Sequence, residues 1–218
     1  SLEVLSRNAR ADSLDGLVVQ GNLCDALLRG MKHDEARRCF QRLLPRHEAL
    51  YGESRALVSL LLESGLAELG GGNIAAALAG FDRAAAMAGH YLPNDTALVR
   101  IIGLSRAEAL LVLGRMPEAA AIVDIDRSSR DPLIAGMAAA LDGRMQLATG
   151  HRAQAVEAFN RASAAINGQP HDYRWHGERV LAVLASPAAN EWVLQHAAGS
   201  GLSATSVRLT LSTAEKIG

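Results

Sequence analysis

Apolar residues recur along the chain at spacings of three and four, which is the period of an amphipathic α-helix. In the stretch LATGHRAQAVEAFNRA, residues 147–162, a glycine ends one apolar run, and Ala155, Phe159 and Ala162 form the next. Ala and Leu, which favour helices, supply most of the apolar positions. Alternating apolar and polar runs, the mark of strands, are missing except near the C-terminus. The pattern predicts an all-α protein.

A pattern of the form Ala–x3–Phe–x2–Ala recurs along the chain. Its four occurrences are Ala36, Phe40 and Leu43; Ala77, Phe81 and Ala84; Ala119, Val123 and Asp126; and Ala155, Phe159 and Ala162. Their first members are 41, 42 and 36 residues apart. Self-similarity with a period of roughly 20–50 residues is typical of stacked arrays. We therefore expect consecutive units in which the large residue fills the gap between neighbours.

Each later unit also has a first half that ends at a glycine. Gly72, Gly114 and Gly150 follow apolar runs, with a small residue seven positions earlier and a Leu three positions earlier. Glycine permits the positive φ that ends a helix, and small residues let two helices approach closely. Pro117 falls in the first turn of a second helix, where its missing N–H costs nothing. Each unit is thus predicted to be an antiparallel helix pair with a glycine elbow.

This arrangement resembles the tetratricopeptide repeat (TPR) family, in particular its long-repeat bacterial and kinesin-light-chain-like members. The segment GRMQLATGHRAQAVEAFNRA, residues 143–162, carries the resemblance most fully. It implies a right-handed superhelical solenoid of about four to five helix-turn-helix repeats. Three features depart from the family pattern: the Leu before each elbow stands one residue later, the gap from Gly30 to Ala36 is one residue longer, and Asp126 occupies a small apolar position.

The expected repeat domain covers residues 14–198. Its units are 14–47, 55–90, 97–127 and 133–167, followed by a degenerate unit at 173–198 that would cap the array. Residues 1–13 are expected to be the end of a preceding helix or an added segment, because the chain opens with Ser1 and looks like a piece of a larger protein. Residues 199–218 read as a Gly/Ser-rich linker and a tail, either a short strand or the start of a helix.

Charge and cysteine content narrow the possible functions. The 22 Lys and Arg residues balance 23 Asp and Glu residues, so direct nucleic-acid binding is not expected. No apolar run approaches the ~18–20 residues of a membrane span. Cys24 and Cys39 lie in apolar helical pattern and are expected to be buried free thiols, with a disulfide or redox switch as the alternative. A cytoplasmic location fits these features.

A search for catalytic and metal-binding motifs finds none that predicts an enzyme, a metal site or a cofactor. The GGG at 70–72 lacks the Lys and Ser/Thr of a phosphate loop and predicts a helix-ending turn. The GSGLS at 199–203 follows no predicted strand, unlike a nucleophile elbow. His171, Asp172 and His176 form the only cluster of metal-capable side chains, but the two His are five residues apart and fall at an expected loop.

A non-catalytic interaction module is therefore the predicted function, as a partner-binding or sensory region of a larger bacterial protein. The resemblance suggests transcriptional regulators, signalling kinases or secretion components, and a protein or peptide ligand in the concave groove. The family's groove positions are Leu62, Leu66, Leu69, Leu104, Glu108, Leu111, Val112, Arg144 and Leu147, beside Ala140 and Ala148. Periodicity alone equally allows these residues to be core. The alternative function is a homodimeric scaffold, joined through apolar residues in 1–12 and 202–218.

Overall fold

The computed structural model describes residues 13–92 and 94–167. Within these residues it contains eight α-helices and no strand, which confirms the all-α prediction. The chain divides into two compact units, residues 1–99 and 100–218. The expectations for residues 1–12, the unit at 173–198, the cluster at 171–176 and the tail at 199–218 lie outside the described residues.

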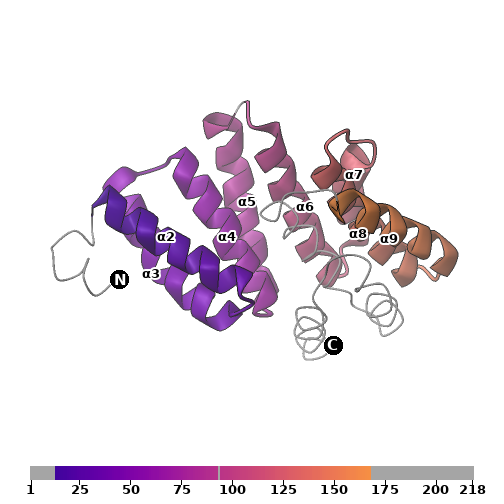
Figure 1. Ribbon diagram of the computed structural model, residues 1–218, viewed down its shortest axis with the longest axis horizontal. Helices are drawn as coiled ribbons and strands as arrows, with labels where there is room; N and C mark the ends of the chain where they lie inside the picture. Colours follow the sequence, from indigo (N-terminus) through magenta and orange to yellow (C-terminus); the bar gives the residue numbers. More distant parts are fainter. Residues whose placement is uncertain (1–12, 93, 168–218) are drawn as a thin grey trace. The chain divides into compact units, whose positions relative to one another are not determined.

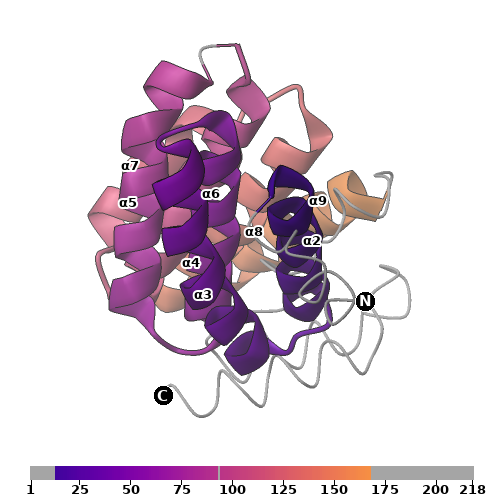
Figure 2. The ribbon, with the colours of Figure 1, turned by 90° about the vertical axis from the view of Figure 1, so that its left-hand side faces the viewer.

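Among the described residues, the first compact unit contains four complete helices that pack in chain order. They are α2 (Leu14–Arg29), α3 (His33–Tyr51), α4 (Arg55–Gly70) and α5 (Ile74–Tyr91). α3 packs against both α2 and α4, and α5 packs against α4 (Figures 1 and 2). α3 continues through Pro45 to Tyr51, beyond the expected end of the unit at residue 47. Ser13 and Ser54 cap α2 and α4 by accepting hydrogen bonds from Gly16 and Leu57.

The second compact unit continues the alternation of first and second helices. Its helices are α6 (Thr96–Val112), which begins just before the boundary, α7 (Met116–Asp126), α8 (Pro132–Ala148) and α9 (Arg152–Asn167). α8 packs against α7 and α9. Pro117 lies in the first turn of α7, as predicted. Asp131 caps α8, accepting hydrogen bonds from the backbone N–H groups of Leu133 and Ile134.

The three predicted glycine elbows are confirmed. Gly72, Gly114 and Gly150 follow the ends of α4, α6 and α8 with φ of 82°, 71° and 82°. Each donates its N–H to the carbonyl three residues earlier, and the next residue donates to the carbonyl five residues earlier. This is the Schellman arrangement, which satisfies carbonyls at a helix end and needs a left-handed residue. A side chain at these glycines would be strained.

The elbow of the first helix pair is Met31, not Gly30. Met31 has φ of 58°, whereas Gly30 has φ of −77° and serves as the C-cap of α2. Met31 and Lys32 donate to the carbonyls of Leu28 and Leu27, repeating the hydrogen bonds of the glycine elbows. Counted from Met31, the distance to Ala36 equals the elbow-to-Ala distance in the other three pairs. The one-residue departure in the first unit therefore disappears.

All twelve residues of the recurring pattern are buried in the structure. In the pairs α4–α5 and α8–α9, the small residue seven positions before the elbow lies against the large residue of the same pair. A Cβ on Gly65 would stand 2.5 Å from Phe81, and a Cβ on Gly143 would stand 2.6 Å from Phe159. The large residue therefore fills the contact within its own helix pair, whereas the sequence suggested the gap between units.

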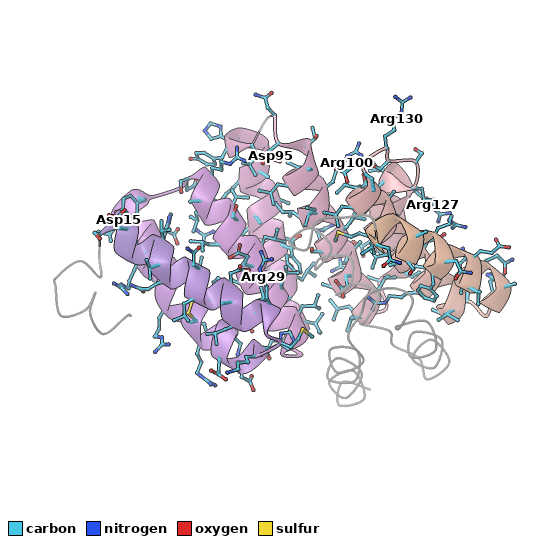
Figure 3. All side chains as sticks on the ribbon, viewed as in Figure 1. Asp15, Arg29, Asp95, Arg100, Arg127 and Arg130 are labelled. Carbon is cyan, nitrogen blue, oxygen red and sulfur yellow. A yellow bond between two sulfur atoms is a disulfide. The ribbon has the colours of Figure 1, made fainter. Side chains whose placement is uncertain are left out.

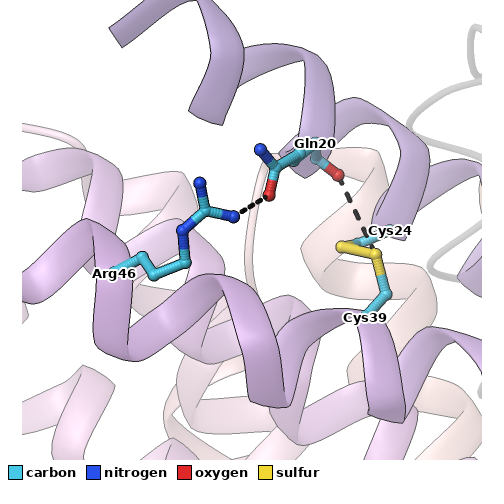
Figure 4. The surroundings of a disulfide bond; sticks show 4 residues. All are labelled: Gln20, Cys24, Cys39 and Arg46. Carbon is cyan, nitrogen blue, oxygen red and sulfur yellow. Dashed lines mark hydrogen bonds between the residues drawn. A yellow bond between two sulfur atoms is a disulfide. The ribbon is translucent and has the colours of Figure 1, made fainter. Parts of the chain in front are cut away.

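Cys24 and Cys39 form a disulfide, so the expectation of free thiols is wrong (Figure 4). With Met31 as the elbow, Cys24 stands at the small position of the first pair, and Cys39 precedes the large residue Phe40. This register brings the two Cα atoms to 5.4 Å, within the range for a disulfide. Beside it, the Gln20 side-chain oxygen accepts a hydrogen bond of 2.8 Å from Arg46, which also joins α2 to α3.

Candidate partner-binding site

The structure buries six of the nine residues predicted to line a groove. Leu62, Leu66 and Leu69 on α4 are at most 4% exposed, and Leu104, Glu108 and Arg144 are at most 7% exposed. Ala140 is also buried. These side chains belong to the protein core, which is the alternative that periodicity left open. Partner binding by the set stays a prediction, and burial restricts it to the three remaining residues.

Leu111, Val112 and Leu147 are the predicted groove residues that remain half-buried. Leu111 and Leu147 hold the same place in their helices, three residues before the elbows Gly114 and Gly150. Leu113, which follows Val112, is 44% exposed. We call Leu111, Val112 and Leu147 the elbow surface. It offers apolar contact area where α6 and α8 end.

An ion pair between Glu108 and Arg144 places α6 and α8 side by side. Glu108 Oε1 lies 3.5 Å from Arg144 Nη1, and both side chains are almost fully buried. Both residues stand six positions before their elbows, so equivalent positions of the two helices face each other. Leu111 and Leu147 stand three residues further along in their helices, at equivalent places before the two elbows. In α4 the equivalent position is the buried Leu66.

Charged side chains join α6, α7, α8 and α9 at the partly exposed side of the second compact unit. Asp142 on α8 pairs with Arg127 (3.1 Å) and Arg161 (3.5 Å). Asp126, the last residue of the third triplet, lies 3.3 Å from Arg100, which is labelled in Figure 3. Burial raises the pKa of Asp126, and Arg100 opposes this shift. These contacts link α8 to α9 and to the end of α7, and α6 to α7.

Two glutamates of α4 sit in different surroundings. Glu68 accepts hydrogen bonds from Gln41 on α3 (3.3 Å) and from Asn73 in the turn before α5 (2.8 Å). Glu63 lies near Asp25 and Arg29 of α2. Burial, and after it the negative charge of Asp25, raises the pKa of Glu63 to about 7, although Arg29 opposes the shift. Glu68 is thus a structural link, whereas Glu63 carries a cost of ionisation near neutral pH.

Metal binding receives no support in the part of the chain that the structure describes, where no group of three or more His, Cys, Asp or Glu side chains could hold an ion. The same residues contain no helix that is both long and apolar enough to cross a membrane. Sequence reasoning missed one surface, the outward face of α2, where Val18, Val19 and Leu23 are exposed. Its apolar pattern was visible, but periodicity does not tell which face lacks a neighbour.

Comparison with known proteins gives no relative. No protein-family model, no curated protein and no solved structure matches the chain.

Proposed function

We propose that this chain is a TPR-like protein-interaction module, a partner-binding or sensory region of a larger bacterial regulatory protein. Its ligand is a protein or peptide that places apolar side chains against the elbow surface. The repeated helix pairs, with equivalent elbows and equivalent small–large contacts, support the TPR-like assignment. Proteins built from such pairs use the surface of their first helices for extended ligands.

The observation that carries this proposal is the half-exposure of Leu111 and Leu147 at equivalent places on neighbouring helices. These two apolar side chains and Val112, which follows Leu111 in the chain, are of the type that an amphipathic helix or an extended peptide contacts with its own apolar residues. A partner that removes these apolar side chains from water gains affinity through the hydrophobic effect.

A cytoplasmic location stays a prediction from the sequence. The Cys24–Cys39 disulfide counts against it, because cytoplasmic thiols are usually kept reduced.

The proposal is tested by screening the full chain against a peptide array and remeasuring each binder with Leu111→Asp and Leu147→Asp. Each change is expected to weaken affinity at least about tenfold, because a buried carboxylate replaces an apolar anchor. Ile125→Asp is the matched control, since Ile125 is 71% exposed on α7 and outside the elbow surface.

Thermal unfolding of each variant shows whether the fold is kept. Leu66→Asp is not suitable, because Leu66 is 1% exposed and the change would test folding. A tight binder that is indifferent to both elbow-surface changes would contradict the proposal.

A further inference from the structure

α2 exposes an apolar face that no described helix covers. Val18 is 53% exposed, Val19 is 41% exposed and Leu23 is 38% exposed. Ala26, one turn further along the helix, is also exposed. We call these four residues the α2 stripe. Their spacing places them on one side of the helix.

The equivalent residues of the other first helices are covered. The α2 stripe lies 13, 12, 8 and 5 residues before the elbow Met31. At these positions α4, α6 and α8 carry Ser59, Leu60, Ser64 and Ala67; Ile101, Ile102, Arg106 and Ala109; and Met137, Ala138, Asp142 and Met145. Every one of these residues is buried or half-buried. In α4 and α8 a preceding second helix, α3 or α7, packs against the first helix. The α2 stripe is therefore a stacking face without such a neighbour among the described helices.

We propose that the α2 stripe binds the same stripe of a second copy of this chain, with the two α2 helices antiparallel. The choice of occupant rests on charge. Asp15 and Arg29 lie at opposite ends of α2 (Figure 3). Antiparallel packing brings Asp15 of each copy to Arg29 of the other, whereas parallel packing would bring like charges together.

The geometry of such a pair is self-complementary. A two-fold axis near Asn22 sets Val18 of one copy opposite Ala26 of the other, and the same contact repeats by symmetry. Asn22, which is exposed, faces its own copy, where two amides can exchange hydrogen bonds. Arg29 also pairs with Asp25 of its own helix at 2.7 Å, and its side chain is 32% exposed, so its positive charge can still attract Asp15 of the other copy. The dimer thus removes the apolar stripe from water and joins charges at both ends.

This dimer does not depend on the proposed function, because the α2 stripe and the elbow surface lie on different helices. The first experiment measures the mass of the full chain by sedimentation equilibrium over a concentration series. The wild type is expected to form a dimer. Val19→Glu and Val18→Glu are expected to raise its dissociation constant at least about tenfold. Ile125→Glu changes an exposed apolar residue of α7 and is expected to dimerise like the wild type.

A second experiment tests the orientation by cross-linking. In a mildly oxidising buffer, Asn22→Cys is expected to form a disulfide between two chains, because the axis passes near this residue. Asp15→Cys is expected to stay uncrosslinked, because antiparallel packing separates the two copies of residue 15. Circular dichroism checks that both variants stay helical.

Three results would overturn the dimer. One is a wild-type chain that stays monomeric over the whole series, which would mean that another segment or partner covers the stripe. Another is a dimer that survives both Val18→Glu and Val19→Glu, which would place the contact elsewhere. The third is a cross-link through Asp15→Cys instead of Asn22→Cys, which would make the helices parallel.

Discussion

Met31 carries a backbone conformation that the other helix pairs assign to glycine. An L-residue with a Cβ pays roughly 1–2 kcal/mol in the left-handed region, because the Cβ approaches the carbonyl oxygen. Met31 holds φ of 58° because its N–H and that of Lys32 complete the hydrogen bonds at the end of α2. The elbow thus forms without glycine, and the strain at Met31 lowers the free energy of unfolding.

Met31→Gly is therefore expected to stabilise the protein. The gain from relieving the Cβ contact is reduced by the larger conformational entropy of unfolded glycine, which leaves about 0.5–1 kcal/mol. Urea unfolding of both proteins measures the difference in the free energy of unfolding. The comparison variant Gly150→Ala, at an elbow with φ of 82°, is expected to lose about 1–2 kcal/mol. If both changes shift stability in the same direction, the equivalence of Met31 and Gly150 is wrong.

Glu63 links stability to pH. Its pKa in the folded protein is about 7, above the model-peptide value of 4.5, so folding favours the protonated carboxyl. The folded protein therefore loses no stability to Glu63 below pH 4.5, where the carboxyl is protonated in both states. It loses stability as the pH rises from 4.5 to about 7, and the loss is complete above that pH. Glu63→Gln should raise the free energy of unfolding by about 1–3 kcal/mol near pH 8 and change it little near pH 4.

Urea unfolding at both pH values measures the effect. Glu48→Gln, on an exposed carboxylate that pairs with Arg83, is the comparison and should show no such pH-dependent gain. A Glu63→Gln effect that is equal at the two pH values would contradict the assignment.

Within a helix pair, the residue seven positions before the elbow and the large residue of the triplet fill the same space between the two helices. Phe81 touches Gly65 and Phe159 touches Gly143, whereas the pair α6–α7 has Ala107 and Val123 at the same two places. The smaller residue Val123 thus accompanies the larger residue Ala107, which replaces glycine at the small position. In the first pair the residue seven positions before the elbow is Cys24, whose sulfur is bonded to that of Cys39.

This complementarity predicts a rescue. Gly65→Ala places a Cβ at 2.5 Å from the Phe81 ring and is expected to cost about 1–3 kcal/mol. Phe81→Val alone leaves a cavity and should cost about 2–4 kcal/mol. The double variant, which reproduces the pair Ala107 and Val123, should be more stable than the sum of the two losses by at least about 1 kcal/mol. Additive losses in a double-mutant cycle would contradict the conclusion that residues 65 and 81 fill the same space.

At the scale of the whole chain, the sequence predicts the elements better than the exposed surfaces. The triplet pattern and the glycine elbows could be found because each places a residue type with a strict steric need at a fixed spacing. The disulfide was missed because Met31 hides the first elbow and shifts the apparent register by one residue. The groove residues Leu62 and Leu104 look alike to periodicity whether solvent or another helix covers them, so their burial could not be foreseen.

The contact between successive helix pairs in the second compact unit gives a prediction at this scale. Arg144→Leu leaves Glu108 buried without its ion pair and is expected to cost about 3–5 kcal/mol. Glu108→Leu combined with Arg144→Leu repeats the Leu66 solution of α4 and should recover most of that loss. Calorimetry of the single and double variants measures both. A double variant no more stable than Arg144→Leu would show that the charges are required for packing.

The disulfide has a practical consequence for spectroscopy. Cys24 and Cys39 are the only two cysteines of the chain, and they are bonded to each other in the disulfide. Under non-reducing conditions a cysteine introduced at an exposed residue such as Ile125 would therefore carry the sole reactive thiol. A fluorophore or spin label can then be attached at one chosen site by maleimide chemistry without first removing native cysteines.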